Sequence, residues 1–572
     1  MSFQDRREFL EALTAGSLGL GILGRRMEGA TSSLGRGEEM ASDGGNDKRP
    51  NIMVIMADDM GFSDLGCYGG EIDTPNVDGL AEDGCRFTQF YNASRCCPTR
   101  ASLLTGQYPH NVGVGRNGVT MDRNGVTIAE ALQRGGYNTS MFGKWHLSVM
   151  DPLEDEQKHQ AWLDHQHDPG RPFAPLDSYP VARGFDEHYG VIWGVVNYFD
   201  PFSLVDGYDP IEQVPDDYYI TDAINRRAAQ AVRRYADEEA PFFMYVSHTA
   251  PHWPLHARPE DLEKYRGRYC GGWDQLREER FRRQVELGLF DESRVTLPPV
   301  QDGTAEWEAL SEEEKAFEAG KMEAHAAMVD RLDQGTGWIL EALRETGQLE
   351  NTLLFFLSDN GSSPELPKRW GPGLDRPSET RDGQKIRYEG FEQAGSETTF
   401  AGIGPPWASA TNTPFRYWKA QQYEGGAHTP CIAHWPAGLK PEPGSLVGQA
   451  GHVMDVLPTC LDLADVEYPD RFNGHEITPL DGMSLTPVLA GDEREGHDQI
   501  FFEHVGGKAV LEDKWKLVSL RRGDAPWRLY NLAEDPTETS DLSDQHPNRV
   551  ASMIDDWQVW ARSVGLEAVE PG

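Results

Sequence analysis

The sequence is short of lysine and has no long apolar run. Only 13 of its 53 basic residues are lysine, and 93 acidic residues give it a formal net charge of −40. A surface this acidic repels nucleic acid and anionic membranes, so neither is an expected partner. No stretch is apolar for the roughly 18 residues that a membrane span requires. Two alternative explanations of this charge remain open: adaptation to high salt, or an ordinary acidic surface.

Cysteine is also scarce. The seven cysteines are scattered along the chain, and no pair has C-x-x-C spacing. This pattern fits neither a zinc site nor a disulfide framework, so most of them are expected to be buried thiols. The adjacent pair Cys96 and Cys97 needs a separate explanation.

The amino-terminal region is expected to lie outside the catalytic fold. Arg6 and Arg7 precede a weakly apolar segment, so residues 1–27 resemble a twin-arginine signal for export to the periplasm or the medium. Two acidic residues fit such a signal poorly, and a plain helix there would leave the protein cytoplasmic. Residues 28–48, rich in glycine, serine and glutamate, are expected to form a flexible linker.

The remaining chain predicts two structural regions. Residues 49–467 alternate short apolar runs with amphipathic stretches, which is typical of an α/β catalytic domain with a large, mainly parallel sheet flanked by helices. The expected strands include 52–56, 139–142, 242–246 and 353–357, with a helix over 322–343 and a long loop over 369–406. Residues 468–572 predict a smaller antiparallel sheet with a final helix over 550–564.

Each of these four strands is followed directly by polar residues. They are Asp58 and Asp59, then Lys144 and His146, then His248 and His252, and finally Asp359 and Asn360. Because ligands bind at the carboxyl ends of the strands in open α/β sheets, we expect one composite site.

Four of these residues, Asp58, Asp59, Asp359 and Asn360, offer only oxygen ligands. Such ligands suit Ca²⁺ or Mg²⁺ better than zinc. An aspartate pair also occurs at helix caps and in solvated turns. The second strand-end pair favours the metal interpretation.

Cys96 is expected at a helix start, because Pro98 is suited to a first turn. Backbone N–H groups at that position favour an anion, and Arg100, one turn on, can point to the same place. A thiol there is reactive. A buried cysteine beside a capping turn fits the spacing equally well, so the residues alone leave both interpretations open.

The run from Cys96 to Gly106 resembles the sulfatase signature C-x-P-x-R-x-x-x-x-T-G. The similarity extends over roughly residues 49–572, is closest to the bacterial arylsulfatase branch, and includes 144–146, 250–254, 358–361 and 423–426. It implies an alkaline phosphatase-like fold and hydrolysis of sulfate esters, on a sulfated carbohydrate or an aryl sulfate. It also implies that a formylglycine-generating enzyme oxidises Cys96 to the aldehyde formylglycine.

The family's catalytic roles carry over to matching positions. The hydrated aldehyde at position 96 would attack sulfur, beside a Ca²⁺ (or Mg²⁺) ion held by Asp58, Asp59, position 96, Asp359 and Asn360. Arg100 and Lys144 would stabilise the growing charge. His252, aided by Lys419, would protonate the leaving alcohol, and His146 would take the proton that expels sulfate. His248 and His504 are further candidates for substrate contacts.

Two other functions remain open. The first is hydrolysis of phosphate or phosphonate esters, with this chain as a close relative of the sulfatases that has the same nucleophile and metal. A non-catalytic descendant would bind sulfated polymers, and its mark would be the loss of a metal ligand or of the signature cysteine. Neither loss is seen in this sequence.

Overall fold

The computed structural model describes residues 49–165, 171–300, 304, 306–521 and 525–566. The expected export signal and linker, residues 1–27 and 28–48, lie outside these residues and stay predictions. Within the described part of the chain, no helix combines the length and apolar character that a membrane crossing needs.

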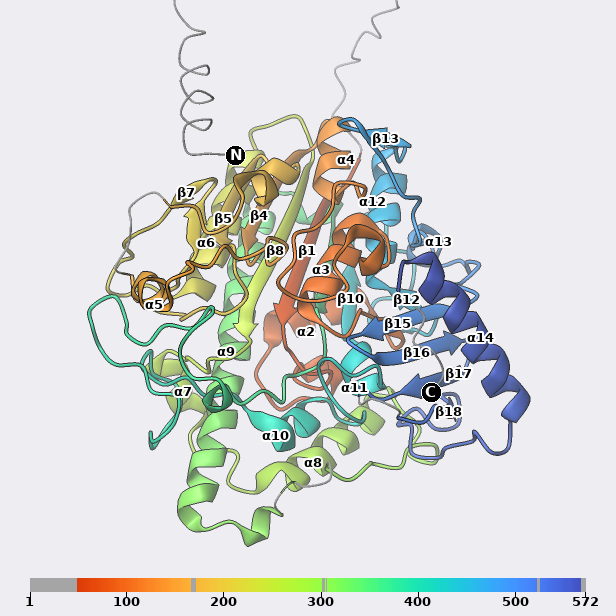
Figure 1. Ribbon diagram of the computed structural model, residues 1–572. Helices are drawn as coiled ribbons and strands as arrows, with labels where there is room; N and C mark the ends of the chain where they lie inside the picture. Colours follow the sequence, from red (N-terminus) through yellow and green to blue (C-terminus); the bar gives the residue numbers. More distant parts are fainter. Residues whose placement is uncertain (1–48, 166–170, 301–303, 305, 522–524, 567–572) are drawn as a thin grey trace, which may run out of the picture. The chain divides into compact units, whose positions relative to one another are not determined.

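A ten-stranded mixed sheet forms the centre of the catalytic region (Figure 1). Its strand order is β11 (Ser445–Val447), β2 (Cys85–Phe87), β10 (Cys431–His434), β9 (Thr352–Ser358), β1 (Asn51–Asp58), β8 (Phe242–Pro251), β4 (Asn138–Gly143), β5 (Glu187–Val191), β6 (Leu204–Asp206) and β7 (Asp209–Pro210). The four strands expected from the sequence, β9, β1, β8 and β4, are central neighbours and run parallel. Antiparallel pairings of β10, β6 and β7 make the sheet mixed, as predicted.

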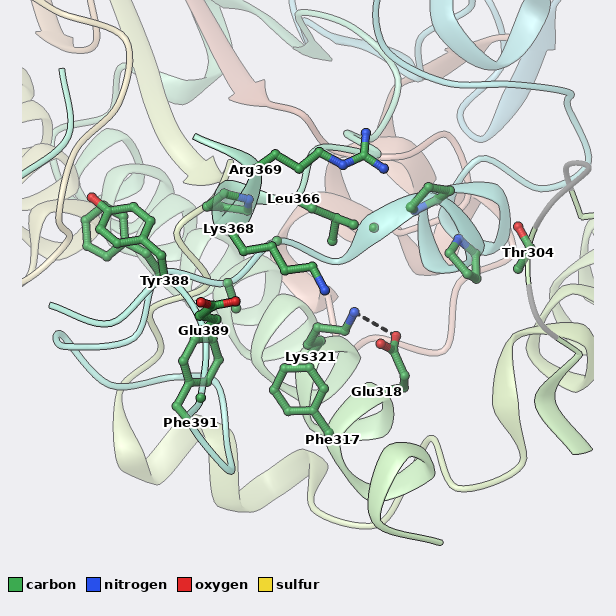
Figure 2. Close-up of a pocket in the computed structure, with 18 of the residues that line it drawn as sticks. Thr304, Phe317, Glu318, Lys321, Leu366, Lys368, Arg369, Tyr388, Glu389 and Phe391 are labelled. Atoms are coloured by element: carbon green, nitrogen blue, oxygen red, sulfur yellow. Dashed lines mark ion pairs between the residues drawn. The ribbon is translucent and has the colours of Figure 1, made fainter. Parts of the chain in front are cut away.

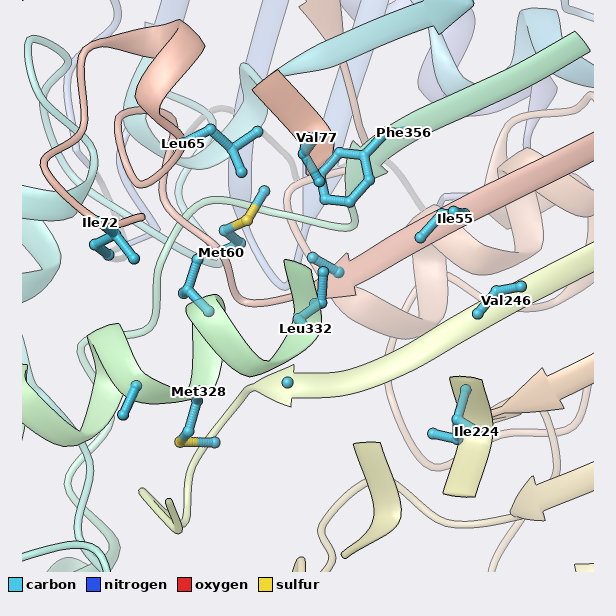
Figure 3. Close-up of a cluster of buried hydrophobic side chains, with 14 of the residues drawn as sticks. Ile55, Met60, Leu65, Ile72, Val77, Ile224, Val246, Met328, Leu332 and Phe356 are labelled. Carbon is cyan, nitrogen blue, oxygen red and sulfur yellow. The ribbon is translucent and has the colours of Figure 1, made fainter. Parts of the chain in front are cut away.

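Alternate side chains of the central strands pack into two helical layers. Ile55, Val246 and Phe356 pack with α2 (Pro75–Asp83), α6 (Ile220–Tyr235) and α9 (Glu312–Glu345), as Figure 3 shows in part. Val54 and Phe355 pack on the other face with α3 (Cys96–Thr105), α4 (Ile128–Arg134) and α12 (Val456–Ala464). Because both faces are covered, β1, β8 and β9 are largely continuous apolar runs in the sequence, whereas β4 begins with Asn138, Thr139 and Ser140.

The helix expected over 322–343 is longer in the structure. It begins at Glu312, because Ser311 and Glu314 form a capping box at its start. The expected loop over 369–406 ends earlier, since α10 (Gly404–Thr411) begins inside it. Residues 370–403, all of them described, are irregular apart from isolated β-bridges.

The tail forms the expected antiparallel sheet and helix. Strands β15 (Ile500–His504), β16 (Gly507–Glu512), β17 (Trp515–Ser519) and β18 (Arg528–Asn531) follow one another in order. One face packs against α14 (Pro547–Ser563), and the other packs against Tyr91 and Tyr423 of the catalytic region. The boundary between residues 467 and 468 stays a prediction. In the stretch that follows it, Phe472 and Leu485 pack in the core of the large sheet.

A buried ion network fixes this second sheet to the catalytic region. Lys516 of β17 is fully buried and pairs with Glu424 at 2.5 Å and with Glu538 at 3.1 Å. Glu424 begins α11 (Glu424–Ala427) and also lies 2.8 Å from Nδ1 of His428. The network therefore anchors the segment that immediately follows Lys419.

Candidate active site

Strand register brings the expected site residues to one edge of the large sheet. Ala57 of β1 pairs with Ser358 of β9, so Asp58 and Asp359 follow side by side. Ser247 of β8 pairs with Met56 of β1 on one side and with Gly143 of β4 on the other. The polar residues that follow these strands therefore meet where the parallel strands end.

Three carboxylates and an amide are buried together at this edge. The backbone N–H of Asp59 donates to Oδ1 of Asp359 at 3.2 Å, and Nδ2 of Asn360 donates to Oδ1 of Asp59 at 2.6 Å. Asp58 and Asp359 are 0% exposed and Asp59 is 2% exposed. Among the described residues, Oδ1 of Asp58 and Oδ1 of Asn360 have no hydrogen-bond partner. Orphaned oxygens beside clustered carboxylates fit a hard divalent cation.

Each carboxylate has its own cationic partner. Lys144 Nζ lies 2.6 Å from Asp58, and Lys419 Nζ lies 2.7 Å from Asp59. The Nη2 atom of Arg100 lies 2.7 Å from Asp359, and its Nη1 atom also donates to Ser247 of β8. Three cations from three separate elements therefore compensate the buried negative charge.

The carboxylates respond differently to this environment. Burial alone would raise the pKa of Asp58, but Lys144, His252 and Arg100 hold that pKa well below its usual range. Burial and the charge of Asp58 raise the pKa of Asp359 well above its usual range, even though Arg100 opposes the shift. Arg100 thus offsets the negative charge at Asp359 only in part, and a bound cation would offset it further.

Cys96 begins α3 and is almost fully buried. Nδ2 of Asn117 lies 3.4 Å from its Sγ atom. A hydrogen bond from Cys97 lowers the pKa of the Cys96 thiol most; burial opposes this, and His146 with Lys419 adds to it, so the pKa lies well below its usual range. The expected helix-start placement is observed, and the position is suited to negative charge.

His146 lies against Cys96 in a left-handed backbone conformation, with φ of 60°. The possible ligand atoms of Cys96, Cys97 and His146 all lie within 4.8 Å of one another. A Cβ atom on Gly194 would lie 2.4 Å from Nε2 of the ring, so any other residue there would displace the ring. Burial and the charge of Lys144 lower the pKa of His146 to about 4, and the ring is therefore neutral at pH 7.

His252 is oriented by its own backbone neighbour. Its Nδ1 atom lies 2.5 Å from the carbonyl oxygen of Trp253, which can only accept, so Nδ1 carries a proton. Its Nε2 atom lies 3.5 Å from Asp59. Burial lowers the pKa of His252, while Asp59 opposes that shift. Nε2 is therefore the atom that gains or delivers a proton.

A cavity of about 280 Å³ opens onto this cluster. Cys96, His146, His252 and Lys419 line it. The other residues of the cluster are at most 2% exposed and do not line the cavity: Asp58, Asp59, Asp359, Asn360, Arg100 and Lys144.

Two residues that were not predicted from the sequence, Asn117 and Glu365, also line the cavity. Glu365 pairs with Arg95 at 2.9 Å, accepts from Nε1 of Trp253 at 2.8 Å, and lies 3.9 Å from Lys419. Glu365 follows the predicted metal ligand Asn360 closely in the sequence, and this position could have indicated that it lies near the site. Asn117 lies in an irregular stretch and carried no such indication.

The two further histidines do not line the cavity. His248 on β8 is fully buried, and neither of its ring nitrogens has a hydrogen-bond partner among the described residues. Burial lowers its pKa to about 3. His504 ends β15, with Nδ1 3.3 Å from the carbonyl oxygen of Gly115. Their roles as substrate contacts stay predictions.

Comparison with known proteins identifies the family. The protein-family model described as Sulfatase matches residues 50–466. A second family model, described as N-sulphoglucosamine sulphohydrolase, C-terminal, matches residues 415–556. An uncharacterised sulfatase of Schizosaccharomyces pombe is 32% identical over 556 residues, covering 91% of this chain and 94% of that protein. The arylsulfatase of Klebsiella aerogenes is 30% identical over 472 residues, covering 77% and 92%.

A solved structure supports the fold. Ps i-CgsB in complex with k-i-k-neocarrahexaose matches with a TM-score of 0.63 and 24% identity, covering 91% of this chain and 94% of that one. The predicted alkaline phosphatase-like arrangement of a large mixed sheet and a small antiparallel sheet is confirmed. Because the matching family model spans most of the chain, including every strand that ends at the cluster, the chain belongs to the sulfatase family and is a sulfatase.

Proposed function

We propose that this sulfatase hydrolyses its sulfate ester with a nucleophile made from Cys96, after oxidation to formylglycine, and with a divalent cation. The observation that carries the proposal is the meeting of Cys96, His146, His252 and Lys419 on one cavity above the buried carboxylates. A thiol of lowered pKa at a helix start indicates a position that favours negative charge.

Ca²⁺ is the proposed cation, with Mg²⁺ as the other hard-ligand choice. Asp58, Asp59, Asp359, Asn360 and position 96 would hold it, and the orphaned oxygens of Asp58 and Asn360 support that assignment. The bound cation supplies Lewis acidity and neutralises the negative charge of the sulfate.

The chain's own cations orient the ester and stabilise charge on its oxygens. Arg100 and Lys144 are fully buried and already paired with carboxylates, so they need no reorganisation during the reaction. Lys419 lies between Asp59 and Glu365 and presents a positive charge at the cavity wall. All three would favour the transition state over the bound ester.

The two histidines would divide the proton transfers. Protonated Nε2 of His252 would give its proton to the oxygen of the departing alcohol. His146, neutral because burial and Lys144 lower its pKa to about 4, would take the proton whose loss from position 96 expels sulfate and restores the aldehyde. The hydrated aldehyde has two hydroxyl groups, of which one would attack sulfur and the other would lose the proton to His146. A plain thiol has no such second group and could not release sulfate in this way.

The alcohol part of the ester, which departs in the reaction, is proposed to be a sugar or an aryl group. An arylsulfatase is among the relatives, and a structural neighbour was solved with k-i-k-neocarrahexaose. At the cavity wall, the rings of Trp253 and Trp370 stack with centroids 6.0 Å apart, which suits a flat sugar face or an aromatic ring. Export through residues 1–27 and maturation by a formylglycine-generating enzyme belong to the same proposal.

Oxidation of Cys96 can be read directly from peptide mass. In active protein, the tryptic peptide that holds Cys96 should be about 18 Da lighter than its cysteine form. Cys97→Ser is the matched control and should keep both the mass loss and the activity, whereas Cys96→Ala should lose both. Full activity with an unmodified Cys96 thiol would exclude this nucleophile.

Cation binding should stabilise the folded protein. Ca²⁺ at one hundred times its Kd should add about 2.7 kcal/mol to the free energy of unfolding, because it binds only the folded carboxylate cluster. Asp59→Asn should abolish this gain in a thermal shift measurement. Asp375→Asn, at the wall of the same cavity, should retain it. An equal gain in both variants would place the cation elsewhere.

The position of His146 can be tested through Gly194. Gly194→Ala should displace the ring and lower kcat by about a hundredfold, while the melting temperature changes little. Gly79→Ala is the control, because a Cβ atom there meets nothing within 4 Å. Unchanged kcat in Gly194→Ala would argue against a proton transfer by His146.

A further inference from the structure

A second cavity lies beside the segment 366–376 that walls the active site. Leu366 to Arg369 line this second cavity, whereas Trp370 and Leu374 to Arg376 line the first. Its volume is about 630 Å³. Its other walls are the start of α9, the loop over 388–391 and the start of α10 (Figure 2). The size is that of a ligand site for one or two sugar rings.

Positive charge gathers in this cavity. Lys321, Lys368 and Arg369 line it, together with the carboxylates of Glu318 and Glu389. Figure 2 shows the side chains of Lys321 and Lys368 converging on the same part of the cavity. A chain with 13 lysines and a net charge of −40 thus places two lysines together here. Such a cluster attracts an anion that the rest of the surface repels.

The two lysines differ in their surroundings. Lys321 is 5% exposed and pairs with Glu318 at 2.7 Å. Burial lowers the pKa of Lys321, Glu318 opposes that shift, and the charge of Lys368 adds to it. Lys368 is exposed, and among the described residues it has no ion-pair partner. An anion between the two ammonium groups would relieve their repulsion.

Two pairs of aromatic rings line the cavity. Phe317 and Phe391 lie with ring centroids 5.6 Å apart, and Tyr388 packs against Phe400 at 5.0 Å. All four residues line the cavity. Flat apolar rings beside cations suit a ligand with one apolar face and one anionic group, which describes a sulfated sugar better than a bare anion.

We propose that this cavity binds a sulfated sugar unit of an oligosaccharide substrate. The inference rests on the proposed function, since it assigns the substrate to the sulfated carbohydrates. Lys368 and Arg369 directly precede Trp370, which stacks on Trp253, and Trp253 donates to Glu365 beside Lys419. A ligand held by Lys368 would therefore also fix the aromatic wall of the active site.

Binding by full-length Cys96→Ala protein, which cannot form the aldehyde, tests the proposal without turnover. The probes are a dextran sulfate oligosaccharide, unsulfated dextran of equal length and sodium sulfate, measured by calorimetry. Lys368→Ala should weaken binding of dextran sulfate by about tenfold, the loss of one charge-assisted contact. Lys368→Arg should largely restore it. Lys385→Ala removes a lysine from the same long loop outside the cavity and should have no effect.

Two results would overturn the proposal. One is equal affinity for dextran sulfate with and without the Lys368→Ala change. The other is sodium sulfate binding as tightly as dextran sulfate, which would indicate a simple anion site. Matured Lys385→Ala protein should cleave a small aryl sulfate at the wild-type rate. If matured wild-type protein leaves that aryl sulfate intact, the proposed function fails, and the binding data still decide this inference.

Discussion

The burial of three neighbouring carboxylates constrains the whole catalytic region. Asp58, Asp59 and Asp359 are at most 2% exposed, and like charges so placed repel strongly in a medium that screens poorly. They are tolerated because cations reach them from several directions. Arg100 comes from α3, Lys144 follows β4, and Lys419 precedes α11. Each of these elements must therefore be in place before the cluster can form.

The small C-terminal sheet takes part in this arrangement. Lys419 and Glu424 belong to one short segment, and Lys516 of the second sheet pairs with Glu424 inside the protein. Removing one partner of such a buried pair leaves an uncompensated charge, which is costly. The second sheet is thus linked through a few residues to the carboxylate of Asp59, and the two regions depend on each other.

Two site residues have a left-handed backbone conformation, which also indicates that the surrounding structure holds the site in place. Asp59, directly after β1, and His146, three residues after the end of β4, have φ of 66° and 60° although neither is glycine. Such conformations cost about 1–3 kcal/mol and persist where the surroundings hold them. Here the hydrogen bonds of Asp59 and the hydrogen bond from the backbone N–H of His146 to the carbonyl oxygen of Ile192 provide that restraint.

The sequence predicted the parts of this site that strands deliver. Strands buried on both faces are largely continuous apolar runs, so β1, β8 and β9 and the polar residues after them could be recognised. The apolar part of β4 is shorter and ends at Phe142, just before Lys144 and His146. No local sequence pattern predicts the order of these strands in the sheet. Asn117 and Glu365 escaped because irregular segments bring them to the cavity, and only long-range packing sets the course of such segments.

The same limit applies to the histidines. His248 follows Ser247 on β8, and neighbouring side chains of a strand point to opposite faces. Ser247 accepts from Arg100 in the site, and His248 does not line the cavity. The sequence placed both at the strand end but did not reveal which one faces the cluster. The cavity beside Lys368 could not be predicted either, because its walls come from several segments that lie far apart in the sequence.

The central claim is that this cluster is built for a sulfate ester, which carries one negative charge, rather than for a phosphate monoester, which carries two, or for a phosphonate ester. Matched aryl sulfate, aryl phosphate and aryl phosphonate esters, given to matured protein with Ca²⁺, test it most directly through kcat/KM. We expect the sulfate value to exceed the other two by at least about a hundredfold. Faster cleavage of the phosphate or the phosphonate ester would contradict the claim.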